Sequence, residues 1–100
     1  MTSILFNGDD RGYLEWLELN PGGYAVNFRR RFDPTYVILH RANCVHMKKY
    51  PNMDANPGGF TEKSYLKVCG NEIGGIENLL RLRFGYLSGI SKKCGICKPI

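Results

Sequence analysis

The sequence predicts an α+β fold in which two helices pack on a small antiparallel sheet. Two stretches carry apolar residues at helical spacing, three shorter stretches have strand-like composition, and turn-forming residues separate them. The chain has 100 residues, which is the usual size of one domain. We therefore expect residues 1–100 to form a single domain with a modest core.

The first predicted helix follows Asp9 and Asp10. A carboxylate caps a helix here because it accepts hydrogen bonds from the free amides of the first turn. Leu14 and Leu17 then share one helical face. The sequence Asn-Pro-Gly-Gly at residues 20–23 should end the helix, since proline cannot continue it and glycine readily adopts left-handed angles.

Three strands are expected. Residues 24–28 alternate, with their aromatic and valine side chains on one face, and residues 35–39 are rich in β-branched and aromatic side chains. These two strands should form a hairpin whose turn carries the arginines at residues 29–31. Residues 65–69 alternate and predict the third strand.

A loop and a second helix complete the expected fold. Two prolines, two asparagines and two glycines predict a loop at residues 50–59. Asn71 is the expected cap of a helix that runs through Leu82 and ends near Gly85. Separate groups of strands and helices are typical of an α+β fold.

The strongest local signal is the sequence Cys94-Gly95-Ile96-Cys97. Two cysteines separated by two residues can direct both sulfurs at one metal ion, and a glycine gives the turn its freedom. Redox motifs share this spacing, but they normally open a helix after a strand. A proline follows here at residue 99, so a metal knuckle is favoured over a redox pair, and inert thiols come third.

Two further ligands must come from four residues elsewhere, His40, Cys44, His46 and Cys69. His40 and Cys44 follow a predicted strand closely, as a second knuckle would. With Cys94 and Cys97 they make a set of one histidine and three cysteines, which is a standard structural zinc shell. The expected fold is therefore a small antiparallel sheet with two helices and a zinc knuckle, in which zinc stabilises a thin core.

Cys69 leaves an alternative open. It ends an apolar run, and cysteine is among the most buried residue types, so core packing is the favoured interpretation. If Cys69 replaces His40 as a ligand, the site has four sulfurs. His46 is the weakest candidate and is expected on the surface.

The two ligand pairs resemble the two halves of Ada-type metal-binding domains, over roughly residues 40–99. The halves here read His-Arg-Ala-Asn-Cys at residues 40–44 and Lys-Cys-Gly-Ile-Cys-Lys-Pro at residues 93–99. The family reads roughly C-R-P-S-C, then a helix, then R-P-C-x-x-C-x-P. Residues 50–70 look like an insertion relative to that pattern. The resemblance implies a structural zinc site in a domain that contacts DNA.

The resemblance also limits the activity that can be carried over. In the Ada protein the first cysteine accepts a methyl group from a DNA phosphotriester, and His40 stands at that position here. Imidazole is a poor substitute for a zinc-bound thiolate nucleophile, so methyl transfer is not expected. Cys44, Cys94 and Cys97 match the remaining ligand positions.

The net charge of +5 is concentrated in the half of the chain with the cysteines. Residues 1–39 carry four basic and five acidic side chains, and residues 40–100 carry ten basic and four acidic ones. This asymmetry indicates a polyanionic partner, although a merely basic surface explains the charge equally well. The candidate phosphate contacts are Arg29, Arg30 and Arg31, extended by Arg41, Lys48, Lys49, Lys92 and Lys93 if the fold brings them together.

The sequence thus predicts a zinc-stabilised module that binds nucleic acid, DNA more than RNA, as an accessory to DNA repair, restriction or a mobile element. The alternative is a protein-interaction module with purely structural zinc. A small nuclease or hydrolase comes third, because a closed four-ligand shell leaves no position for water. Neither a phosphate-binding glycine loop nor a nucleophile elbow occurs, and no small-molecule substrate is indicated.

The sequence also indicates a compartment. No apolar run is long enough to cross a bilayer, and the first eight residues lack the basic flank of a signal peptide. We therefore expect a cytoplasmic protein without a membrane partner, in which reduced thiols are free to bind metal.

Overall fold

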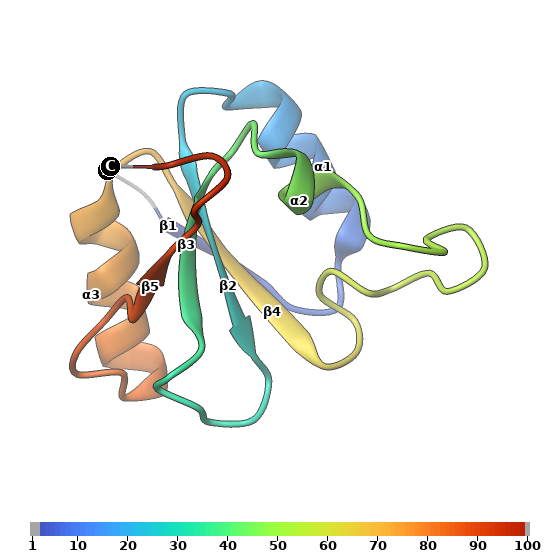
Figure 1. Cartoon of the computed structure of the whole chain (residues 1–100). Helices are drawn as coiled ribbons and strands as arrows, with labels where there is room; N and C mark the ends of the chain where they lie inside the picture. Colours follow the sequence, from blue (N-terminus) through green and yellow to red (C-terminus); the bar gives the residue numbers. More distant parts are fainter. Residues whose placement is uncertain (1–2, 100) are drawn as a thin grey trace.

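A five-stranded sheet forms the centre of the computed structural model, which describes residues 3–99 (Figure 1). The strands lie in the order β1-β4-β2-β3-β5. Neighbouring strands are antiparallel, except that β5 pairs parallel with β3. In chain order the elements are β1 (Ser3–Phe6), α1 (Asp10–Leu19), β2 (Tyr24–Arg29), β3 (Val37–Arg41), α2 (Val45–Lys48), β4 (Tyr65–Gly70), α3 (Ile73–Phe84) and β5 (Lys92–Lys93).

Helices cover both faces of the sheet (Figure 1). Alternate residues of a strand point to opposite faces, so the strands contribute to two separate core clusters. On one face Val26 and Val68 pack with Ile76 and Leu80 of α3. On the other face the cluster contains Leu17 of α1 together with Met47 of α2. The central strands therefore have no fully hydrated face.

The helix α1 begins where the sequence places its cap. Asp9 Oδ1 accepts a hydrogen bond of 2.8 Å from the Gly12 amide. Tyr13 and Leu17, four residues apart and hence on one face of the helix, are both buried against the sheet. Asn20 ends the helix, and its backbone amide donates to the Trp16 carbonyl.

Asp10 holds the long connection between α2 and β4 against α1. One of its carboxylate oxygens accepts hydrogen bonds of 2.7 Å from both the amide and the hydroxyl of Thr61, and the other accepts one of 3.3 Å from the Phe60 amide. The Asp9 amide in turn donates to the Thr61 hydroxyl oxygen at 2.8 Å. Thr61 is fully buried, so these bonds stand in for water at its polar groups.

Asp10→Ala should therefore destabilise the protein. The change leaves the buried amide and hydroxyl of Thr61 without their acceptor, which costs about 1–3 kcal/mol. The matched control is Asp54→Ala, because Asp54 is an exposed carboxylate in the same connection; we expect it to change stability by less than about 0.5 kcal/mol. Urea denaturation measures both variants, and equal midpoints would contradict the role given to Asp10.

The α+β class is confirmed, and the fold has more elements than predicted. The predicted helices correspond to α1 and α3, and the predicted strands to β2, β3 and β4. The structure adds the one-turn helix α2 and the strands β1 and β5. The cap of α3 is Glu72 rather than Asn71, and β3 begins at Val37 rather than Thr35. None of the helices within residues 3–99 combines the length and apolarity that a bilayer crossing requires.

Candidate metal centre

The pairing of β5 with β3 brings the two predicted ligand pairs together. His40 lies on β3, and Cys44 directly precedes α2. The segment that follows β5 is held beside β3, because the Cys94 amide donates to the Leu39 carbonyl at 2.9 Å. Cys97 then follows in the tight turn after Cys94. The four residues thus meet at the end of β3, although more than fifty positions separate the first from the last.

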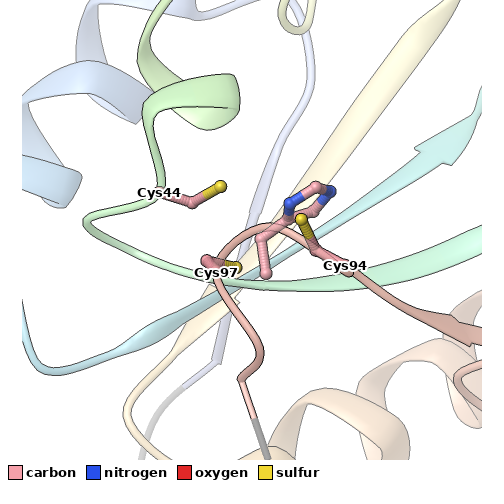
Figure 2. A group of neighbouring side chains, drawn as sticks. Cys44, Cys94 and Cys97 are labelled. Atoms are coloured by element: carbon pink, nitrogen blue, oxygen red, sulfur yellow. The ribbon is translucent and has the colours of Figure 1, made fainter.

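The four side chains form a compact cluster. The imidazole of His40 and the sulfurs of Cys44, Cys94 and Cys97 each offer a ligand atom, and these atoms all lie within 4.8 Å of one another. Figure 2 shows the three cysteine side chains converging from two segments of the chain. A tetrahedral ion with bonds of about 2.3 Å to sulfur sets its sulfur ligands about 3.8 Å apart, so the shell needs a contraction of only about 1 Å. The cluster could hold a metal ion.

His40 gives an independent sign that this cluster is a ligand set. Its side chain is buried, and its Nδ1 atom has no hydrogen-bond partner among residues 3–99. Burial lowers the pKa of His40 to about 4, with smaller contributions from His46 and Lys67. The imidazole is therefore neutral at pH 7, which is the form that binds metal. An unpartnered buried nitrogen is costly, and a bound cation would satisfy it.

Backbone amides are directed at two of the sulfurs. The Ile96 amide donates to Cys94 Sγ at 3.4 Å, and the Arg41 amide donates to Cys97 Sγ at 3.2 Å. Burial raises the pKa of Cys94, but the amides of Cys97 and Ile96 favour its thiolate, and the net shift is downward. Burial raises the pKa of Cys44 to about 11. A bound cation would make all three thiolates favourable, because the thiolate is the ligand form.

The other two candidate ligands lie outside the cluster. Cys69 is fully buried in the core beside α1 and faces Ala25 across the β2–β4 ladder. Burial raises its thiol pKa to about 12, so it stays protonated at neutral pH. His46 is exposed on α2. These positions agree with the expectation that Cys69 packs in the core and that His46 lies on the surface.

The predicted phosphate contacts do not form one patch with the metal cluster. Ala25 pairs with His40, and Phe28 pairs with Val37. Arg29 therefore lies four residues further along β2 than Ala25, which is about 13 Å at the rise of a strand. Figure 1 shows the turn between β2 and β3 at the opposite end of the sheet from the segment after β5. The condition attached to the extended patch, that the fold brings these residues together, is not met for the turn and the knuckle, because the antiparallel register of β2 and β3 separates them.

Three of the predicted phosphate-binding arginines already bind groups of the protein itself. Arg29 lies with its guanidinium 4.4 Å from the centre of the Tyr36 ring and also pairs with an aspartate. Arg30 donates to the carbonyls of Lys63 and Thr61 at 2.7 and 2.9 Å. Arg41 donates to the carbonyls of the C-terminal knuckle and fastens it to β3. The remaining five predicted contacts, Arg31, Lys48, Lys49, Lys92 and Lys93, are exposed.

The sequence interpretation missed one cation in this region. Lys63 lines the same hollow as the three arginines of the β2–β3 turn, because the Arg30 amide donates to the Ser64 carbonyl at 2.8 Å. Nothing local in the sequence relates residues more than thirty positions apart. The pairing of β2 with β4 determines that they are neighbours.

The chain was also compared with known proteins. No protein-family model, curated protein or solved structure matches it. The resemblance to Ada-type domains therefore rests on the residues quoted for it and stays a prediction. The structure itself shows an α+β fold in which one histidine and three cysteines form a cluster that could hold a metal ion.

Proposed function

We propose that the protein is a zinc-stabilised module that binds nucleic acid, with DNA as the first candidate. Three cysteines and one histidine in a closed cluster are the donor set of structural zinc sites, and soft sulfur ligands disfavour magnesium and calcium. Four protein ligands leave no position for a catalytic water, so the metal's role is to stabilise the fold. A reducing compartment such as the cytoplasm is part of this proposal, because it keeps the thiols available.

A cationic hollow beside the β2–β3 turn carries the proposal of a nucleic-acid partner. Its volume is about 720 Å³, and four of its lining residues are basic, namely Arg29, Arg30, Arg31 and Lys63. Asp33 is the one acidic residue among those that line it, and it already pairs with Arg29 at 3.3 Å. Such a concentration of positive charge attracts phosphates and releases their counterions.

This proposal predicts a strong dependence of binding on salt. The affinity for single strands should fall with a log–log slope of about −0.7 per neutralised phosphate, and for duplexes of about −0.9. Changing Arg31 and Lys63 together to glutamine should weaken binding and flatten the single-strand slope by about 1.4. Both side chains are exposed, so zinc content and stability should not change. Fluorescence anisotropy with labelled oligonucleotides at several salt concentrations measures the slope.

Lys48→Gln with Lys49→Gln is the matched control, because it removes the same charge at the end of α2. We expect the control to alter the slope far less than the Arg31 and Lys63 pair. If the control flattens the slope equally, the hollow is not the contact surface. Absence of binding at low salt by folded, zinc-loaded protein would contradict the proposal of nucleic-acid binding altogether.

A protein partner is the second candidate function. Val45 and Ile96 adjoin metal ligands in the sequence, yet their side chains are 56% and 70% exposed. Exposed apolar side chains held on a rigid metal turn suit a protein contact. If oligonucleotides do not bind, a protein partner becomes the leading candidate. Ile96→Ser would then test it, because the change should weaken binding of that partner.

A further inference from the structure

Lys67 is a buried cation that the metal centre does not use. Its side chain is 3% exposed on β4. Its ammonium group donates to Asn27 Oδ1 and to the Phe60 carbonyl, each at 2.8 Å. An ammonium has three N–H donors, so these hydrogen bonds use two of them, and the ammonium also lies 5.6–5.8 Å from the ring centres of Tyr13, Phe60 and Tyr65. Burial lowers the pKa of Lys67 to about 8, although Cys69 and Asp10 act in the opposite direction, which reflects the cost of a buried charge that is only partly compensated.

A cavity of about 400 Å³ lies over this lysine, and we call it the Lys67 cavity. Asn27, Lys67 and Tyr65 line it from the sheet, and His46 and Tyr50 line it from α2 and the connection that follows. None of the described residues that line it is acidic. Its size falls within the usual range for small-molecule sites, and Tyr36, Tyr50, Phe60 and Tyr65 give it an aromatic part. The cavity therefore suits a flat, uncharged or anionic ligand and disfavours a cation.

The Lys67 cavity adjoins the cationic hollow beside the β2–β3 turn. The two share Lys63 and Ser64 as lining residues. Tyr36 and Tyr65 lie at this junction with ring centres 5.9 Å apart, and the guanidinium of Arg29 lies over both rings. An aromatic cavity that adjoins a cationic surface offers one place for a ring and another for a phosphate.

We propose that the Lys67 cavity binds one nucleotide, with its base in the cavity and its phosphate toward Lys63 and Arg31. The nucleotide is either free or part of a single strand; in the second case the inference rests on the proposed nucleic-acid binding. A base buried in a duplex cannot reach such a cavity, whereas an unstacked base packs on aromatic side chains. The inference thus makes single strands the better ligand.

Lys67 also determines which bases fit best. An ammonium only donates hydrogen bonds, so it needs an acceptor such as a carbonyl oxygen on the base edge. Thymine carries two carbonyl oxygens, whereas adenine accepts only through ring nitrogens, and its N1 and N7 lie beside an amino group that presents a donor to the ammonium. Because a hydrogen bond to a charged group is worth about 1.5–3 kcal/mol, we expect this difference to favour thymine by about tenfold or more. Thymidine nucleotides should therefore bind more tightly than deoxyadenosine nucleotides.

The test compares oligothymidylate and oligodeoxyadenylate of equal length by fluorescence anisotropy. Wild-type, zinc-loaded protein should prefer thymidylate at least tenfold, and Lys67→Met should lose that preference while keeping the salt-dependent affinity that the arginines supply. Arg83→Met, at an exposed arginine of α3, is the control for loss of one positive charge and should keep the preference. If Lys67→Met fails to fold, the half-buried Tyr36→Ser replaces it and should weaken thymidylate binding by about tenfold.

The outcomes separate this inference from the proposed function. Oligonucleotide binding without base preference, unchanged by Lys67→Met or Tyr36→Ser, overturns the nucleotide cavity and leaves nucleic-acid binding intact. If no oligonucleotide binds, calorimetry with thymidine and deoxyadenosine monophosphates decides the matter. Binding of the thymidine monophosphate would then support a free nucleotide as the ligand and overturn the proposed function. Binding of neither would overturn both.

Discussion

Removing the metal should unfold much of the protein. The metal cluster links β3, the start of α2 and the segment after β5, and the strand that holds this last segment to the sheet is the two-residue β5. Structural zinc sites bind with about 10–16 kcal/mol of apparent free energy in small domains, while whole domains are stable by only about 5–15 kcal/mol. A strong chelator should therefore lower the free energy of unfolding by several kcal/mol. Circular dichroism melts and elemental analysis before and after chelation measure the effect.

Cys97→Ser provides the control for chelation. The variant lacks one sulfur ligand, so it should already show the low stability of the metal-free protein, and chelator should change it little further. We expect the purified wild-type protein to carry about one zinc per chain, because the four residues build one tetrahedral shell. A zinc content near zero in a folded protein that chelator leaves unchanged would refute the metal centre.

His40→Ala should release the metal, and Cys69→Ala should not. Loss of a residue that hydrogen-bonds a metal ligand already lowers metal affinity about 10–100-fold. Loss of the His40 ligand itself should therefore lower the affinity by more than about a hundredfold. Cys69 packs in the core, and its truncation should cost only about 1–2 kcal/mol of stability through the small cavity that it leaves. Competition with a chromophoric chelator measures the affinity, and urea denaturation measures the stability.

These two variants distinguish the set of one histidine and three cysteines from a four-sulfur set. Both changes remove a buried side chain from the same face of the sheet, so a general loss of packing would affect both. Release of zinc by Cys69→Ala alone would show that the ligand assignment is wrong. If both variants bind zinc as tightly as the wild type, neither His40 nor Cys69 is a ligand of the metal.

The elements with strong local patterns were predictable. Three features of the sequence indicate α1, namely a capping residue, an apolar face and a terminating Asn-Pro-Gly-Gly sequence. The strands β2, β3 and β4 have strand-like composition over five or six residues. The strands β1 and β5 were missed because they are short and are defined by partners far away in the chain. Ser3 of β1, for example, pairs with Gly70 of β4. The helix α2 is a single turn of four residues, too short for a periodic pattern.

The four residues of the metal cluster were predictable for a different reason. Each knuckle is a local sequence with its own spacing, so the donor set needs no knowledge of strand order. The surfaces were not predictable, because register and strand order decide which side chains become neighbours. Lys67 illustrates this point. The sequence does not indicate that Lys67 is buried, but helices and their connections cover both faces of the sheet, and the side chain of Lys67 is 3% exposed.

The sequence separation of the two knuckles has a consequence for protein synthesis. At about 5–20 residues per second, a ribosome takes roughly 3–10 s to add the residues that separate Cys44 from Cys94. Strands β1 to β4 are complete before β5 emerges, so we expect a four-stranded intermediate that waits for its last two sulfurs. Metal capture would then be the closing event of folding. In a cell short of zinc, newly made chains would stop at that intermediate and be degraded there.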